Sequence, residues 1–295
     1  MGMSVNDLLQ VTIGGIAMGS IYALIALGYT IIYNALRLIN FAQGDFFMLG
    51  ATFGFTFFVS LNLPFPLSLV LVAIVVGLIG VLVERSVFRP LRDSSPFNLI
   101  IATIGVSTTI RAIALLVWGS QALAFPAVFG STPLKVGQVL IMPAYLWMLG
   151  IAVLFMLLLQ LFFSYTMLGK AMRAAAQNRN AAFLMGINVF HMDALAAAIS
   201  AGLGGVGGIL VAPIFFADTA MGALAGLKGF AAAVLGGVGS IPGAIAGGIL
   251  LGLSENLSAS LISSVYRDAV AFVILITVLL FKPSGLLGKK GGMKA

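Results

Sequence analysis

The segment LGKAMRAAAQNRNAAFLMGIN, residues 168–188, stands between two long apolar runs, PAYLWMLGIAVLFMLLLQLFFS at 143–164 and MDALAAAISAGLGGVGGILVAP at 192–213. Each run is long enough to cross a membrane, because about 20 helical residues span the roughly 30 Å hydrocarbon core. A few residues would suffice to join two spans. We therefore interpret residues 168–188 as short amphipathic helices at the cytoplasmic membrane surface, where a soluble protein can dock.

The composition is that of a membrane protein. Hydrophobic residues make up 61% of the 295 residues, charged residues make up 8%, and the mean hydropathy is +1.17. A soluble domain carries about 25% charged residues, which cover its surface. We predict an all-α, polytopic transmembrane helical bundle that forms a single transmembrane domain over residues 1–295, with the 168–188 cytoplasmic loop within it.

Nine apolar segments predict eight or nine membrane crossings, some of them discontinuous. The segments are 11–33, 41–61, 65–83, 97–118, 143–164, 192–213, 222–239, 242–263 and 269–281. The segments 222–239 and 269–281 are marginal in length, so the count stays open.

Basic residues predict the orientation, since short cytoplasmic loops are rich in Lys and Arg. They cluster in three regions, which we expect in the cytoplasm: Arg85, Arg89 and Arg92; Lys170, Arg173 and Arg179; and Lys282, Lys289, Lys290 and Lys294 in the C-terminal tail. The loop 119–142 holds one base and is expected outside. Nine crossings place the N-terminus outside, and eight would place it inside.

Several kinds of chemistry lack the residues they need. The chain has no cysteine and one histidine, His191, so we expect no metal site and no catalytic residues. The phosphate-loop pattern GxxxxGK[ST] is absent, as are HExxH and GxSxG, and we expect no cofactor. The basic residues that give the net charge of +7 lie beside apolar segments. This pattern indicates the orientation of the chain in a membrane, and we expect no nucleic-acid partner. Any ATP hydrolysis is expected on another chain.

Polar and glycine-broken stretches inside the apolar segments predict a translocation path. Polar groups crowd the start of 41–61, and the run GLKGFAAAVLGGVGSIPGAIAGG is too interrupted for one straight helix. Irregular backbone at membrane depth lines a cavity or is buried in protein, so a tight interhelical turn is the alternative. The path candidates are Asn40, Phe41, Gln43, Asp45, Lys228, Gly236 and Gly237.

Two basic residues in apolar surroundings need partners. Arg111 and Lys228 are costly in lipid, so we expect each to face protein or water. One interpretation pairs them with an acid such as Glu255. The other lets them contact the carboxylate of a cargo molecule.

Long stretches of the chain resemble one family. They are GSIYALIALGYTIIYNALRLINFAQGDFFMLGA (19–51), VERSVFRPLR (83–92), the 168–188 segment, GLKGFAAAVLGGVGSIPGAIAGGILLGLSEN (226–256) and KPSGLLG (282–288). Together they resemble the H-type permease subunit of branched-chain amino-acid ABC importers. That family commonly has His and Glu where this chain has Gln43 and Asp45, a difference that suggests another cargo such as an amide or urea.

The resemblance implies an ATP-driven importer in a bacterial inner membrane. The implied partners are a second homologous permease, two ATP-binding subunits, a periplasmic binding protein, a small amino-acid substrate and membrane lipid. The 168–188 segment corresponds to the family's coupling segment, and the expected docking residues are Lys170, Arg173, Gln177, Arg179 and Gly186. Apart from the resemblance, these basic residues could simply mark topology. A self-powered secondary transporter and a membrane enzyme are the rival hypotheses, although the core offers few acids for ion coupling.

Overall fold

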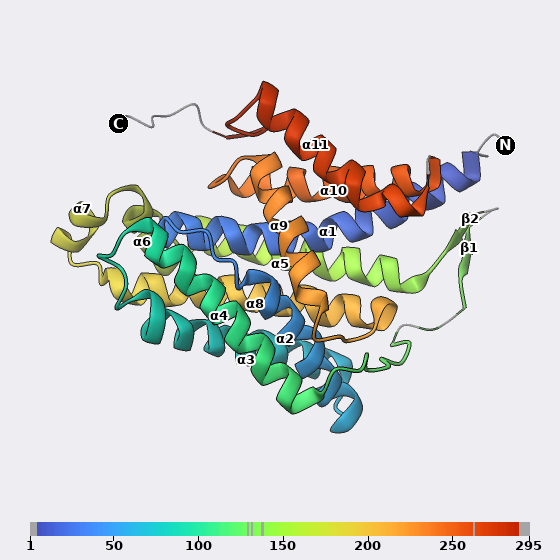
Figure 1. The fold of residues 1–295 in the computed structure, drawn as a ribbon, viewed down its shortest axis with the longest axis horizontal. Coiled ribbons are helices and arrows are strands. Elements are labelled where there is room, and N and C mark those ends of the chain that lie inside the picture. The colour runs from blue at the N-terminus through green and yellow to red at the C-terminus, as the bar shows by residue number, and fades with distance from the viewer. Residues whose placement is uncertain (1–4, 129, 131, 137–138, 262, 289–295) are drawn as a thin grey trace.

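The computed structural model describes residues 5–288 except 129, 131, 137, 138 and 262, and forms a helical bundle with one β-hairpin (Figure 1). The longer helices are α1 (Val5–Leu36), α3 (Phe65–Val83), α4 (Pro96–Trp118), α5 (Pro143–Tyr165), α8 (Val189–Phe215), α10 (Ile241–Leu261) and α11 (Arg267–Phe281). The shorter elements are α2 (Gln43–Phe55), α6 (Met167–Gln177), α7 (Arg179–Leu184), α9 (Met221–Gly236), η1 (Thr56–Ser60), η2 (Glu84–Phe88), η3 (Ser264–Tyr266), β1 (Leu134–Val136) and β2 (Val139–Ile141).

Within the described residues, seven helices are long and apolar enough to cross a membrane. The prediction of a polytopic helical membrane protein is therefore confirmed. The predicted eight or nine segments are reached only by adding α2 with its extension η1, and the 16-residue α9. The tail lysines Lys289, Lys290 and Lys294 lie outside the described residues.

Local sequence signals fix where the helices begin and end. Ser95 caps α4 by accepting a hydrogen bond from the Asn98 amide, and Asn188 caps α8 in the same way through the His191 amide. The predicted break at the glycine-rich run is confirmed, because α9 ends at Gly236 and Ser240 accepts the Gly243 amide as α10 begins. Its turn residues, Gly237 and Gly239, have φ of +105° and +89°, which favours glycine.

Basic side chains gather at one end of the bundle, which we call the basic end. Arg37 donates to the Ala176 carbonyl oxygen, and the guanidinium groups of Arg89 and Arg92 lie over the Phe190 ring at 4.4 and 4.9 Å. The helices α6 and α7 lie at this end, on the left of Figure 1. The β-hairpin lies at the opposite end, which we call the hairpin end.

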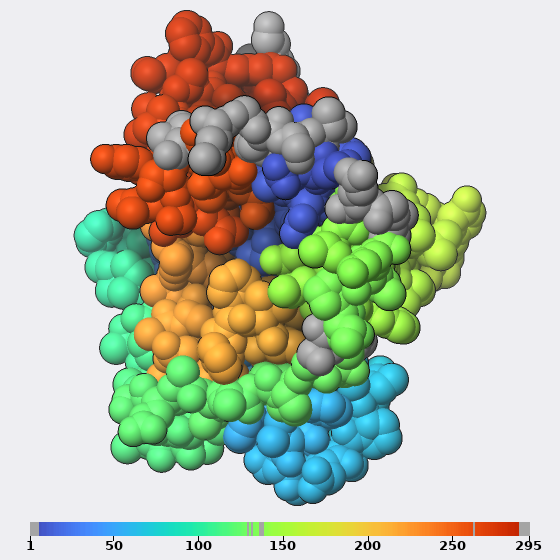
Figure 2. Space-filling model, turned by 90° about the vertical axis from the view of Figure 1, so that its right-hand side faces the viewer, coloured from blue at the N-terminus to red at the C-terminus, as the bar shows by residue number. Residues whose placement is uncertain are grey.

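The connections at the hairpin end pack on one another. Leu123, in the connection from α4 to α5, forms an antiparallel bridge with Ala217, in the connection from α8 to α9. Figure 2 looks onto this end and shows the two connections, green and orange, side by side. The hairpin pairs β1 with β2 antiparallel.

Two short helices, α2 and α9, begin inside the bundle and meet at their first turns. A Cβ on Gly44 would lie 2.1 Å from the Gly222 carbonyl oxygen, so the two backbones touch. Gln43, the first residue of α2, binds Ser200, the twelfth residue of α8. At a rise of 1.5 Å per residue, Ser200 lies roughly 16 Å along α8 from the start of that helix at the basic end. The non-helical link Arg37–Ala42 therefore carries the chain back from the end of α1 to mid-bundle (Figure 1).

Close helix packing depends on glycine. In α8, a Cβ on Gly208 would lie 1.9 Å from the Phe47 carbonyl oxygen of α2, and in α10 a Cβ on Gly252 would lie 2.3 Å from the Gly19 amide of α1. Such close backbone approach is how membrane helices gain van der Waals contact without a hydrophobic driving force. The glycines of the run at 202–210 thus allow α8 to pack closely on α2.

Candidate functional site: a surface segment, a mid-bundle junction and a charged cleft

The predicted surface segment is two short helices, α6 and α7, at the basic end. Thr166 caps α6 through the Gly169 amide, and Asn178 caps α7 through the Ala181 amide. Lys170, Arg173 and Gln177 are exposed on α6. Gly186 ends α7 with φ of +84°, a conformation that any other residue would adopt only with strain. Two short helices are therefore present where they were predicted, and four of the five expected docking residues are exposed.

Arg179, the fifth expected docking residue, points into the protein. Its guanidinium forms an ion pair with Asp193 of α8 and donates a hydrogen bond to the Ala35 carbonyl oxygen at the end of α1. Arg92 reaches the same Asp193 carboxylate at 3.6 Å. Asp193 is almost fully buried, so two arginines from separate loops converge on one buried acid. This cluster ties α7 to the spans.

An exposed apolar tip at the end of α7 was missed by the sequence reasoning. Phe183, Leu184 and Met185 are 66%, 84% and 83% exposed. Three consecutive large apolar residues left open beside polar ones mark an interaction surface or a membrane contact. The sequence FLMG, which follows the polar centre of the segment, indicates such an apolar tip. An interpretation based on charged residues does not detect it.

The mid-bundle junction holds the predicted path residues around the start of α2. The Asn40 side chain accepts the Ala42 amide and so caps the link before α2. The Gln43 side chain is fully buried and exchanges hydrogen bonds with the Ser200 carbonyl oxygen and hydroxyl at 2.9 Å each. Phe41 is partly exposed, and its ring lies 6.3 Å from that of Phe230.

Asp45 is buried beside this junction and pairs with Arg111 of α4 at 3.2 Å. Arg111 was expected to need a partner, and it has one, although the partner is Asp45 and not Glu255. The Arg111 side chain is 39% exposed on a helix that is long and apolar enough to span the membrane. An exposed guanidinium at membrane depth requires water or another protein beside it.

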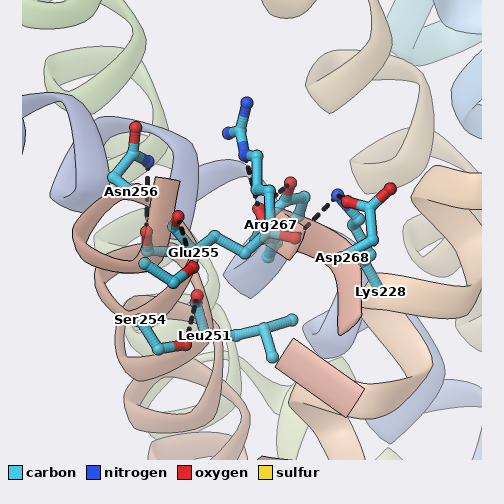
Figure 3. A network of polar contacts seen from close by, with 10 residues as sticks. Lys228, Leu251, Ser254, Glu255, Asn256, Arg267 and Asp268 are labelled. Atoms are coloured by element: carbon cyan, nitrogen blue, oxygen red, sulfur yellow. Dashed lines mark hydrogen bonds and ion pairs between the residues drawn. The ribbon is translucent and has the colours of Figure 1, made fainter. Parts of the chain in front are cut away.

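Lys228 of α9 lies in a second polar cluster, closer to the hairpin end. Its Nζ atom lies 2.6 Å from Glu255 Oε1 and 2.7 Å from Asp268 Oδ1, which confirms the expected pairing with Glu255 (Figure 3). The Arg267 Nε atom lies 3.6 Å from Glu255, and the Tyr22 hydroxyl donates to Glu255 at 2.8 Å. Arg267 and Asp268 are the first two residues of α11, and no local sequence pattern joins them to Lys228.

A cleft of about 470 Å³ opens beside this cluster. Its walls come from α1, α2, α8, the connection from α8 to α9, α9, η3 and the start of α11. The charged lining residues are Asp218, Lys228, Arg267 and Asp268. The apolar lining includes Met18, Ile21, Phe47, Val211, Met221 and Leu224.

Gly236 and Gly237, the last predicted path residues, lie at the other end of α9. A Cβ on Gly236 would lie 1.9 Å from the Gly243 carbonyl oxygen, and the Leu286 and Leu287 amides bond to carbonyl oxygens at the end of α9. The two glycines therefore pack against α10 and the C-terminal segment. The predicted path residues thus fall into three groups, at the mid-bundle junction, at the cleft and at the basic end of α9.

Comparison with known proteins decides the family. Residues 11–279 match the family model described as "Branched-chain amino acid transport system / permease component". The chain belongs to this family. The permeases of this family are transport subunits and not enzymes. In the described residues, no group of three or more His, Asp or Glu side chains could hold a metal ion.

Two relatives cover almost the whole permease. The high-affinity branched-chain amino acid transport system permease protein LivH of Salmonella typhimurium is 38% identical over 95% of this chain and 96% of its own length. The corresponding protein BraD of Pseudomonas aeruginosa is also 38% identical, with the same coverage. Among solved structures, PsaBC from Streptococcus pneumoniae in complex with Fab has a TM-score of 0.51 at 16% identity, over 95% of this chain and 91% of that one. This last similarity concerns the fold alone.

Proposed function

We propose that this permease is one half of the membrane channel of an ATP-driven importer for branched-chain or related small amino acids. A periplasmic binding protein would deliver the cargo, a second homologous permease would complete the channel, and two ATP-binding subunits would drive it. The membrane would be a bacterial inner membrane, with the basic end and the C-terminus in the cytoplasm. The family membership and the names of the relatives support the cargo class.

The strongest support for this proposal is the exposed α6–α7 segment at the basic end. A permease without a phosphate loop needs an external source of work, and this segment presents exposed Lys170, Arg173 and Gln177 beside the apolar tip Phe183–Met185. We propose that these residues dock on an ATP-binding subunit. An apolar tip surrounded by polar groups is the arrangement found in interaction surfaces.

Arg179 and Gly186 contribute to this docking indirectly, because they fix the conformation of the α6–α7 segment. The Arg179 pair with Asp193 joins α7 to the start of α8, so a push on α7 reaches a spanning helix directly. Gly186 supplies the left-handed turn that leads from α7 to α8. We therefore propose Arg179 as the residue that transmits the motion and Gly186 as the turn that positions the tip.

We propose that the cargo passes beside the start of α2 and along α9. Asn40, Phe41, Gln43 and Asp45 surround the junction where α2 and α9 meet, and Lys228 stands at the cleft nearer the hairpin end. Discontinuous helices that meet at the bilayer midplane are the common site of transport. Gly236 and Gly237 would form the joint on which the basic end of α9 moves.

The alternative assignment is that this permease carries an amide or urea. It rests on Gln43 and Asp45, but their side chains are engaged by Ser200 and Arg111 within the chain itself. Gln43 and Asp45 therefore give no reason to assign this permease a cargo other than a small amino acid. The self-powered alternative has little support, because Asp45 and Glu255 are both held in ion pairs with bases.

Purification of this chain from its native membrane in mild detergent tests the proposal. We expect two ATP-binding subunits and one homologous permease in stoichiometric amounts, or two copies of this chain if the channel is a homodimer. Recovery of the chain with no ATP-binding subunit would contradict the proposal. In that case, uptake by the chain alone under a proton or sodium gradient would establish the self-powered alternative.

A further inference from the structure

The charged cleft between α9 and α11 has one fixed acid and one movable acid around the same lysine. Glu255 is fully buried, whereas the side chain of Asp268 is 48% exposed at the start of α11. Both carboxylates lie within 2.7 Å of Lys228 Nζ (Figure 3). Glu255 is held further by the Tyr22 hydroxyl and the Arg267 guanidinium. Asp268 is therefore the partner of Lys228 that can leave.

The charges of the cleft favour a ligand without net charge. The four charges around the lysine balance, Lys228 and Arg267 against Glu255 and Asp268, so an ion of either sign would leave one of them without a counterpart. The rim residue Asp218 adds one acid that an ammonium group can use. A zwitterion adds no net charge. Its carboxylate can take the place of Asp268 on Lys228, and its ammonium then has Asp268 and the rim residue Asp218 as partners.

The remaining walls favour an aliphatic side chain. Ile21, Val211 and Leu224 line the cleft together with Phe47 and two methionines. The volume of about 470 Å³ lies within the range of roughly 300–1,000 Å³ that is usual for small-molecule sites. Glu255 lies fourteen residues after Ile241, so the site is roughly 21 Å along α10 from its start at the basic end. The cleft thus opens toward the hairpin end, where cargo would arrive.

We propose that this cleft is the first station for the cargo inside the permease, a site for zwitterionic aliphatic amino acids at which Lys228 exchanges the Asp268 carboxylate for that of the cargo. This inference rests on the proposed function and adds the place and the chemistry of the site. Exchange of one carboxylate for another keeps Lys228 paired throughout. Binding is therefore weak and the cargo is released readily, as an importer requires.

Cysteine protection tests the site directly, because the chain has no cysteine of its own. Ser264 lines the cleft and is exposed, so the Ser264→Cys variant would be labelled by a small thiol reagent; Ser120→Cys, exposed elsewhere at the hairpin end, is the control. In the assembled importer in nanodiscs without its binding protein, L-leucine is expected to slow labelling at position 264 and not at position 120. Its 2-oxo analogue, which lacks the ammonium group, is expected to protect less.

The Asp268→Asn variant in the Ser264→Cys background tests the exchange. It removes one of the two ammonium partners and the competitor for Lys228, so we expect protection to shift by about tenfold from leucine toward the 2-oxo analogue. Asp93→Asn, an exposed acid at the basic end, should leave the preference unchanged. If leucine fails to protect position 264 in an importer that takes up leucine with ATP, the inference is wrong and the proposed function stands. An importer that takes up no aliphatic amino acid overturns both.

Discussion

The contact between α2 and α8 should be intolerant of a single methyl group. A Cβ at Gly208 would lie 1.9 Å from the Phe47 carbonyl oxygen and 2.8 Å from the Ala51 amide. A carbon–oxygen contact needs roughly 3.3 Å, so the helices would have to separate by about 1.4 Å. Because the obstructing atoms are backbone, Gly208→Ala should cost about 3 kcal/mol, at the upper end of the usual range for overpacking. The gain in helix propensity of about 1 kcal/mol reduces the net loss to about 2 kcal/mol.

Reversible unfolding by SDS in mixed micelles measures this loss. Trp118 packs edge-on against Phe53 of α2 at 5.0 Å and donates to Thr56, so its fluorescence reports on α2 in a Trp147→Phe background. Gly150→Ala is the matched control, because a Cβ there meets nothing within 4 Å. The control should be neutral or slightly more stable. Equal free energies of unfolding for the two variants would refute the account of close helix packing.

Three further changes test other parts of the structure. Leu184→Asp should reduce the recovery of ATP-binding subunits with the permease by about tenfold. Because this side chain is 84% exposed, the free energy of unfolding should change by less than about 0.5 kcal/mol. Leu134→Asp on the hairpin is the control, and equal recovery from both variants would count against docking. Asp193→Asn should release Arg179 and speed tryptic cleavage of α7 by about tenfold; an unchanged rate would show that the ion pair does not hold α7. Glu255→Gln should lower the free energy of unfolding by about 3 kcal/mol, because Lys228 loses its buried partner; unchanged stability would contradict the pairing.

The spans could be predicted from the sequence because lipid imposes a simple rule. Long apolar runs can satisfy their backbone only as helices, so α3 at Phe65–Val83 coincides with the predicted segment, and α4 and α5 differ from theirs by one residue. The 168–188 segment could also be predicted, because it stands between two long apolar runs that a few residues would suffice to join. The break before α10 followed from Gly239, Ser240 and Pro242.

The partners of the buried charges could not be read from the sequence, because they depend on which helices adjoin. Asp45 and Arg111 are 66 positions apart, and nothing local indicates that α2 packs on α4. Arg179 shows the opposite error. Its place in a polar surface segment suggested an outward role, whereas a buried acid fourteen positions later draws it inward. The cleft was missed for the same reason, since Asp268 joins Lys228 only when α11 folds over α9.

In the proposed importer, ATP that is used by other chains drives an aliphatic amino acid through this permease. The most direct measurement is uptake of labelled leucine into proteoliposomes that contain the purified complex, with binding protein outside and ATP inside. We expect accumulation against a gradient with ATP, none with a non-hydrolysable analogue, and about tenfold less with the Leu184→Asp chain. Accumulation by this chain alone, driven by a proton or sodium gradient and indifferent to ATP, would contradict the proposed function.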